Sequence, residues 1–385
     1  MRKAFVYRLY PDKAQETTLS EALDTCRHLY NAALQERRDA WRQQRVSVSF
    51  YQQSAELVDV KRECPEVACV YSQVLQDVLR RIDKTFKSFF RRVKAGEKPG
   101  YPRFRNRDRY DSFTYPQMGF GLVGNRLVLS KIGQVKIKLH RPIEGKIKTV
   151  TLKRTCGKWY AMFSCDVGNA PERRGANRPV GIDVGLETFA TLSDGATVVN
   201  PRYFRKGQDA LAKRQRALSR KRKGSARCRK ARLLVAKAHL KIKRQRRDFA
   251  HKAARQLVQQ YDLIAYEDLR IRNMVRNPHL AKSISDAAWG MFLGILCDKA
   301  EEAGCTTVAV DPRGTSVQCS DCGFPVAKTL SERQHNCPNC GLSLSRDLNA
   351  ARNILRLGLS LQGSTPEKPQ AFQPWGVVTT GLRLM

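Results

Sequence analysis

Four cysteines near the C-terminal end of the sequence stand in two close pairs, Cys319-x2-Cys322 and Cys337-x2-Cys340, with 14 residues between the pairs. A glycine follows each pair directly and permits the tight turn that a tetrahedral site of four thiolates needs. This spacing predicts one zinc ion bound by the four cysteines. A closed site of this kind organises a fold and performs no chemistry, so its meaning depends on the residues beside it.

Acidic residues flank these cysteine pairs on both sides. Asp183 lies in the apolar run 180–184, Glu267 ends the run 263–267, and Asp347 follows the second pair by seven residues at the start of a predicted helix. Cleavage of a phosphodiester by two metal ions requires several carboxylates that bridge ions about 3.5–4 Å apart. Because magnesium prefers oxygen ligands, we predict two magnesium ions held by the three acids.

Each acid also has an ordinary structural explanation when it is taken alone. Asp183 can end a strand before a turn, Glu267 can cap the next helix, and Asp347 can stabilise a helix N-terminus. The catalytic interpretation therefore depends on the order of the features along the chain. Asp268 is left out of the predicted site, because alternation along a strand would turn it to the opposite side from Glu267.

The net charge of +36 over 385 residues predicts a polyanionic partner, and nucleic acid is the usual one. Hydrophobic residues make up 42% of the chain, which indicates a globular protein. We expect no membrane association, because no signal peptide and no apolar run of about 18 residues is evident. The eight remaining cysteines lack a regular spacing, as expected for reduced thiols in a cytoplasmic protein.

The N-terminal half predicts a small antiparallel β-barrel with a helical module inserted in it. Residues 3–9 read as a mostly buried strand, because aromatic and branched side chains dominate there. Apolar residues at intervals of three and four predict helices at about 13–45, 52–62 and 69–93. Further strands are expected at about 126–130, 134–139, 147–155 and 158–167, with the first strand completing the barrel.

The C-terminal half predicts alternating strands and helices. Strands are expected at about 179–184, 187–193, 196–200, 262–267 and 306–310, and helices at about 203–259, 285–303 and 346–357, where Gly358 offers a stop. This is the element order of an RNase H-like domain, with the cysteine pairs inserted before the last helix. The tail at 362–385 is expected to be disordered.

Basic residues are concentrated between Arg202 and Asp248, where twenty Lys or Arg stand against two acids. A charged run often forms only a solvated face, but this density beside the acidic site favours contact with phosphates. The candidate contacts are Arg220, Lys221, Arg222, Lys223 and Arg227. In the helical module, Gln52, Gln53 and Gln76 are candidates to contact bases, although such residues also fit a helix surface or core.

The chain resembles TnpB, a family of transposon-encoded RNA-guided DNA endonucleases related to type V CRISPR effectors. The matching segments are 4–11, 100–104, the Asp183 motif, 266–269, 283–287, both cysteine pairs and 346–351. The resemblance implies a multidomain α+β fold. Its parts would be a wedge β-barrel (1–10 and 97–177), a helical recognition domain (11–96), a RuvC-like nuclease domain (178–310 and 343–361) and a zinc-finger insert that binds target nucleic acid (311–342).

The same resemblance implies that Asp183, Glu267 and Asp347 are the catalytic triad of an endonuclease. Its partners would be a guide RNA derived from the transposon and double-stranded DNA beside a short adjacent motif, with one protein chain per ribonucleoprotein at the bacterial nucleoid. Two alternatives remain open. A guided repressor without nuclease activity would have lost an acid of the triad, and an unguided RNase H-like transposase or nuclease would need no RNA.

Overall fold

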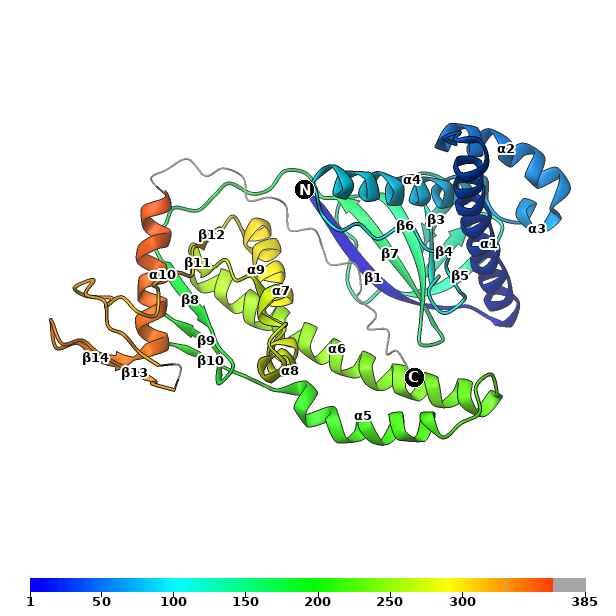
Figure 1. The fold of residues 1–385 in the computed structure, drawn as a ribbon. Helices are drawn as coiled ribbons and strands as arrows, with labels where there is room; N and C mark the ends of the chain where they lie inside the picture. The colour runs from blue at the N-terminus through cyan, green and yellow to red at the C-terminus, as the bar shows by residue number, and fades with distance from the viewer. Residues whose placement is uncertain (330, 363–385) are drawn as a thin grey trace. The chain divides into compact units, whose positions relative to one another are not determined.

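The computed structural model describes residues 1–329 and 331–362, so the predicted tail lies outside the described residues from position 363 onward. The chain divides into two compact units, Met1–Asn169 and a second unit that begins at Ala170 (Figure 1). Each unit is described by itself below.

The first unit combines an antiparallel sheet with a group of helices. Its elements are β1 (Arg2–Tyr10), α1 (Lys13–Gln44), α2 (Phe50–Glu63), α3 (Pro65–Ala68), α4 (Ser72–Lys94), β2 (Ser112–Tyr115), β3 (Phe120–Val123), β4 (Arg126–Leu129), β5 (Gly133–Lys138), β6 (Lys146–Thr155) and β7 (Lys158–Asp166). Helix α1 begins with a capping box, in which Asp12 and Gln15 satisfy each other's backbone N–H groups. The predicted helices and the predicted strands of this unit are all present.

The seven strands form an open half-barrel with the order β2-β6-β7-β1-β5-β4-β3. Strand β1 lies inside the sheet between β7 and β5, and all its pairings are antiparallel. Among the described residues the edge strands β2 and β3 do not pair with each other, so the predicted antiparallel barrel takes the form of a half-barrel. The two edge strands, each only four residues long, were not predicted from the sequence.

Strand β1 buries one face rather than both. Phe5, Tyr7 and Leu9 are almost fully buried, whereas the residues between them are partly or fully exposed. This alternation corrects the expectation of a mostly buried strand, and it is the normal pattern for an antiparallel sheet. The buried face belongs to the same apolar core as the inner faces of α1 and α4.

The second unit contains a mixed sheet covered by helices on both faces (Figure 1). Its elements are β8 (Pro179–Val184), β9 (Thr188–Leu192), β10 (Thr197–Val199), α5 (Tyr203–Ser219), α6 (Ala226–Gln260), β11 (Leu263–Glu267), α7 (Ile271–Met274), α8 (Pro278–Ala287), α9 (Trp289–Ala303), β12 (Thr306–Val310), β13 (Gln334–Asn336), β14 (Ser343–Ser345) and α10 (Arg346–Gln362). The strand order is β10-β9-β8-β11-β12, with β8, β11 and β12 parallel. The predicted order of elements along the chain is confirmed.

The two faces of this sheet follow from alternation along its strands. Val180 and Ile182 of β8 join the core formed with α6 and α9. On the other face, Leu263 and Ala265 of β11 pack with Ile354 of α10. Helix α10 therefore covers the face opposite to α6 and α9.

Helix α10 lies unusually close to the sheet because glycines stand at the contacts. A Cβ atom on Gly181 would lie 2.1 Å from the carbonyl oxygen of Ala351, and one on Gly358 would lie 2.4 Å from the Cβ of Ala265. Gly358 thus provides room inside the helix, which continues to Gln362, so the expected stop at this glycine is wrong.

Replacing Gly181 by alanine is expected to destabilise the second unit by about 3 kcal/mol or more, because the obstructing atoms are backbone. Urea denaturation followed by circular dichroism measures this change. Gly290→Ala in α9 is the matched control, since its new methyl group would meet only the end of the Ile271 side chain at 3.3 Å. A Gly181→Ala protein as stable as the wild type would contradict the close approach of α10.

One helical stretch, Pro278–Ala303, is long and apolar enough to cross a membrane by length and composition, contrary to the expectation that no such run exists. It comprises two helices, since Ala288 between α8 and α9 has a φ of 57°. Trp289, Phe292 and Leu296 of α9 are buried in the core of the second unit. These contacts join one face of α9 to the core of the second unit.

Candidate metal centres

Asp183 and Glu267 lie on the face of the sheet that α10 covers. Alternation places Asp183 on the same face as Gly181, and Glu267 on the same face as Ala265. The parallel pairing of β8 with β11 aligns Gly181 with Ala265, so the two acids follow at the same step along neighbouring strands. Asp347 stands in the first turn of α10. Three separate elements thus bring the predicted acids to one region.

The electrostatics of the site reflect this grouping. Burial, followed by the charges of Glu267 and Asp347, raises the pKa of Asp183 to about 8, while Arg346 acts in the opposite direction. Arg346 also lies beside Asp347, with 3.6 Å between Nε and Oδ1. Crowded carboxylates of this kind suit a divalent cation, whose preferred ligands are hard oxygens. The residues present therefore fit magnesium.

Glu267 is held by Thr315, a residue for which the sequence predicted no functional role. Its hydroxyl oxygen lies 2.6 Å from Glu267 Oε1 and 3.0 Å from the carbonyl oxygen of Pro312. The shorter distance gives Glu267 the single hydroxyl hydrogen, and Thr315 is 2% exposed, so water does not compete for this bond. Burial raises the pKa of Glu267, and the hydrogen bond from Thr315 limits the rise. A residue just before the first cysteine pair thus holds the Glu267 carboxylate in position.

Two asparagines of α10 fasten the same segment to the helix. Asn349 donates to the carbonyl of Gln318 at 2.7 Å and accepts from the backbone N–H of Ser320 at 2.8 Å. Asn353 donates to the carbonyls of Thr315 and Gln318 at 2.9 and 2.7 Å. Both side chains are buried, and their spacing of four places them on one face of the helix. The sequence showed both asparagines beside Asp347, but only their long-range partners reveal their role.

The four cysteines converge as their spacing predicts, with all Sγ atoms within 4.8 Å of one another. Sγ of Cys319 lies 3.6 Å from that of Cys340, and Sγ of Cys322 lies 3.5 Å from that of Cys337. A tetrahedral zinc site with Zn–S bonds of about 2.3 Å places its sulfurs about 3.8 Å apart. The cluster therefore has the dimensions of a zinc site. The other eight cysteines are free thiols.

Two equivalent turns present these thiols. The N–H of Gly323 donates to the carbonyl of Cys319 and the N–H of Gly341 to that of Cys337, both at 3.0 Å. Each glycine has a φ of 75°, which side chains rarely adopt. Hydrogen bonds from the Asn339 side chain and the Phe324 backbone lower the pKa of Cys322 to about 6, which favours the metal-binding thiolate. His335 is buried and contacts Lys328 instead of joining the cluster.

The predicted basic contacts lie at the tip of the α5–α6 hairpin. Arg220, Lys221, Arg222 and Lys223 form the exposed turn between the helices, and Arg227 is exposed in the first turn of α6. The other end of the hairpin is fixed by Asp286 of α8, whose carboxylate accepts from the backbone N–H groups of Phe204 and Arg205 at 2.8 and 3.2 Å. Asp286 thus caps α5 from another helix.

The three glutamines proposed for base contact have different environments. Gln53 is buried, accepts from Arg37 and donates to the carbonyl of Ala33, so it serves the helical core. Gln52 completes the capping box of α2 with Ser49. Gln76 is exposed on the outer side of α4, where it has neither of these structural roles.

Comparisons with known proteins identify the family. A family model described as "Probable transposase" (OrfB of IS605) matches residues 162–278, and one described as "Cas12f1-like, TNB domain" matches residues 289–354. A protein of Streptomyces pristinaespiralis named "Putative RNA-guided DNA endonuclease" is 37% identical over 94% of this chain and 90% of its own length. The chain belongs to the TnpB (OrfB/IS605) family. A third model, described as "Helix-turn-helix domain", matches residues 1–45, which in this TnpB chain form β1 and α1.

The chain is also similar to a second named relative and, more distantly, to a solved structure. A protein of Escherichia coli (strain K12), named "Putative RNA-guided DNA endonuclease InsQ", is 30% identical over 92% of this chain and 92% of its own length. Among solved structures, one described as "Structure of the mini-RNA-guided endonuclease CRISPR-Cas_phi3" has a TM-score of 0.49 at 9% identity and covers 93% of this chain and 92% of that one.

Proposed function

We propose that this TnpB chain is an RNA-guided DNA endonuclease that cuts double-stranded DNA with Asp183, Glu267 and Asp347. The observation that carries the proposal is the grouping of these acids from β8, β11 and α10 on one face of a sheet, where burial and the neighbouring carboxylates raise the pKa of Asp183. The names of two relatives support the guided reaction, and the matches to this chain cover 90% and 92% of their own lengths.

Divalent ions bound by the three acids would supply Lewis-acid activation of water and stabilisation of the leaving 3′ oxygen. The residues of the chain would hold and orient these ligands. Thr315 fixes the Glu267 carboxylate by its hydrogen bond, and Arg346 lies beside Asp347. Zinc bound by the four cysteines would keep the segment behind Thr315 folded, since Asn349 and Asn353 join it to α10.

The proposal extends to the domain layout and to the partners. The second unit would be the RuvC-like nuclease domain, with the zinc-finger insert at 311–342, and the first would hold the wedge and helical recognition domains. The +36 charge suits a single chain that holds a transposon-derived guide RNA and target DNA together. Base pairing would give sequence specificity, while protein residues, including the basic turn at 220–223, Arg227 and Gln76, contact the backbone and the adjacent motif.

The test is the behaviour of the purified full-length chain with its copurifying RNA. We expect a discrete RNA to copurify and a plasmid that matches its guide segment to be cut in magnesium. Cleavage that is unchanged after RNA removal would favour an unguided nuclease. Guided binding without cleavage would favour a repressor, and absence of both RNA and cleavage would refute the proposal.

Removing the Thr315 hydroxyl is expected to slow cleavage about 10- to 100-fold, as loss of a ligand-orienting hydrogen bond typically does. Thr315→Val removes the hydroxyl at nearly constant volume, and Thr315→Ser retains it. Single-turnover cleavage and magnesium-dependent thermal stabilisation measure the two consequences. Equal rates for the valine and serine proteins would show that Thr315 does not position Glu267.

A further inference from the structure

An arginine-rich loop of the first unit, residues 103–109, is not used by the proposed nuclease chemistry. Its four arginines, all exposed, are Arg103, Arg105, Arg107 and Arg109. Both ends of the loop are anchored, because Pro102 is buried and the buried Tyr110 places its ring 6.0 Å from that of Tyr30 in α1. The loop is therefore fixed at its ends while its charges face solvent.

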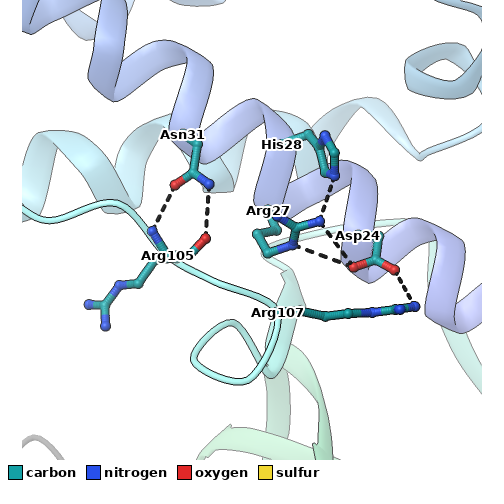
Figure 2. Close-up of polar contacts among 6 residues, drawn as sticks. All are labelled: Asp24, Arg27, His28, Asn31, Arg105 and Arg107. Atoms are coloured by element: carbon teal, nitrogen blue, oxygen red, sulfur yellow. Dashed lines mark hydrogen bonds and ion pairs between the residues drawn. The ribbon is translucent and has the colours of Figure 1, made fainter. Parts of the chain in front are cut away.

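Asn31 of α1 fixes the middle of the loop, as Figure 2 shows. Its Nδ2 donates to the carbonyl of Arg105 at 2.9 Å, and the backbone N–H of Arg105 donates to Asn31 Oδ1 at 2.8 Å. These two bonds satisfy both backbone groups of Arg105, as pairing with a strand would. The Arg105 side chain itself points away from the helix (Figure 2).

One of the four arginines is neutralised within the unit. Arg107 Nη2 donates to Asp24 Oδ2 at 2.8 Å, and the other oxygen of Asp24 accepts from Arg27 (Figure 2). Within residues 1–329 and 331–362, no ion pair involves Arg103, Arg105 or Arg109. Three unneutralised guanidinium groups on one fixed loop favour an anion, and their paired N–H donors match phosphate oxygens.

Aromatic rings accompany these arginines. Tyr101 is 46% exposed and Phe104 is 45% exposed, and the Arg38 guanidinium lies over the Phe104 ring at 5.2 Å. Exposed rings beside arginines suit unpaired bases, which can stack on them. A DNA duplex keeps its bases stacked inside, so the loop favours single-stranded RNA.

We propose that the loop 103–109 binds an unpaired segment of the guide RNA, with Arg105 at a phosphate and Asn31 as the residue that positions the loop. Asn31 would touch no nucleotide itself. The inference rests on the proposed function, because it takes the guide RNA as the occupant.

The test measures binding of the full-length chain to the copurifying RNA, to a short mixed-sequence single-stranded RNA and to a duplex DNA of the same sequence. Asn31→Ala changes no charge, and Arg105→Ala removes one exposed guanidinium. Arg62→Ala is the control, because it removes an exposed arginine of α2 whose charge is already paired with Asp59 at 3.1 Å. A double variant, Asn31→Ala with Arg105→Ala, shows whether the two residues act together.

We expect each single variant to bind both RNAs about fivefold more weakly, with Arg105→Ala lowering the salt dependence of binding by about 0.7 in slope. The double variant should bind about as weakly as Arg105→Ala alone, and Arg62→Ala should bind like the wild type. RNA affinity unchanged in Arg105→Ala, multiplied effects in the double variant, or equal weakening of duplex binding would overturn the inference. Failure of the wild type to bind RNA would instead overturn the proposed function.

Discussion

Cleavage of a guide-matched plasmid is expected to fall about 10³-fold or more in Asp183→Ala and Glu267→Ala, whereas binding of the target is retained. Each substitution removes a ligand of the divalent ions that the reaction needs, but neither removes a contact required for base pairing. Plasmid cleavage and gel-shift assays with the same ribonucleoprotein measure the two properties separately.

Asp268→Ala is the matched control for these substitutions. Asp268 follows Glu267 directly, just after the end of β11, and is exposed, so its removal should leave the cleavage rate within about twofold. Loss of target binding in the Asp183 or Glu267 variants would argue that the acids support the fold instead of the reaction. Full cleavage by either variant would show that the substituted acid is not part of the catalytic site.

Zinc is expected to be lost from Cys337→Ser, and with it the ordered structure of the segment around the cysteine pairs. A serine oxygen is a poor substitute for a thiolate, and zinc binding supplies the folding free energy of small sites of this kind. Because this segment holds Glu267 through Thr315, cleavage should also fall, by about tenfold or more. Metal analysis by mass spectrometry, limited proteolysis and plasmid cleavage give the three readouts.

Cys69→Ser is the control, since Cys69 is an exposed free thiol outside the cluster. It should retain zinc, protease resistance and activity. Unchanged zinc content in Cys337→Ser would contradict the assignment of the cluster. Zinc loss with full cleavage would show that the connection through Thr315 does not reach the catalytic acids.

An element of the fold was predictable where the side-chain pattern of its own segment is enough to define it. The β8 and β11 strands are short apolar runs with an acid at the last or second-to-last position, and α1 and α4 have regular apolar spacing. The edge strands β2 and β3 were missed because they are four residues long and depend on pairing with β6 and β4. The end of α10 was misplaced because Gly358 serves a contact with Ala265 that no local pattern contains.

The candidate site divides in the same way. The acids and cysteines were found because their chemistry and spacing are visible in the sequence. Thr315 carried no local signal, because its partner Glu267 stands 48 residues earlier in the chain. The roles of Asn349 and Asn31 likewise depend on distant backbone groups, those of Gln318 and Arg105. Positioning by hydrogen bonds across the fold is the part that local patterns do not encode.

The bonds from Asn349 and Asn353 to residues 315–320 also set the natural boundaries for exchanging this region between relatives. A chimaera that replaces only the stretch from Cys319 to Cys340 would exchange Ser320, which donates to Asn349, but would keep Gln318, which accepts from both asparagines. The joint would then combine residues from two parents. A block running from 312 to 353 would carry both halves of that joint together. Engineering of the zinc-binding region for new targets should therefore treat the start of α10 as part of the transplanted piece.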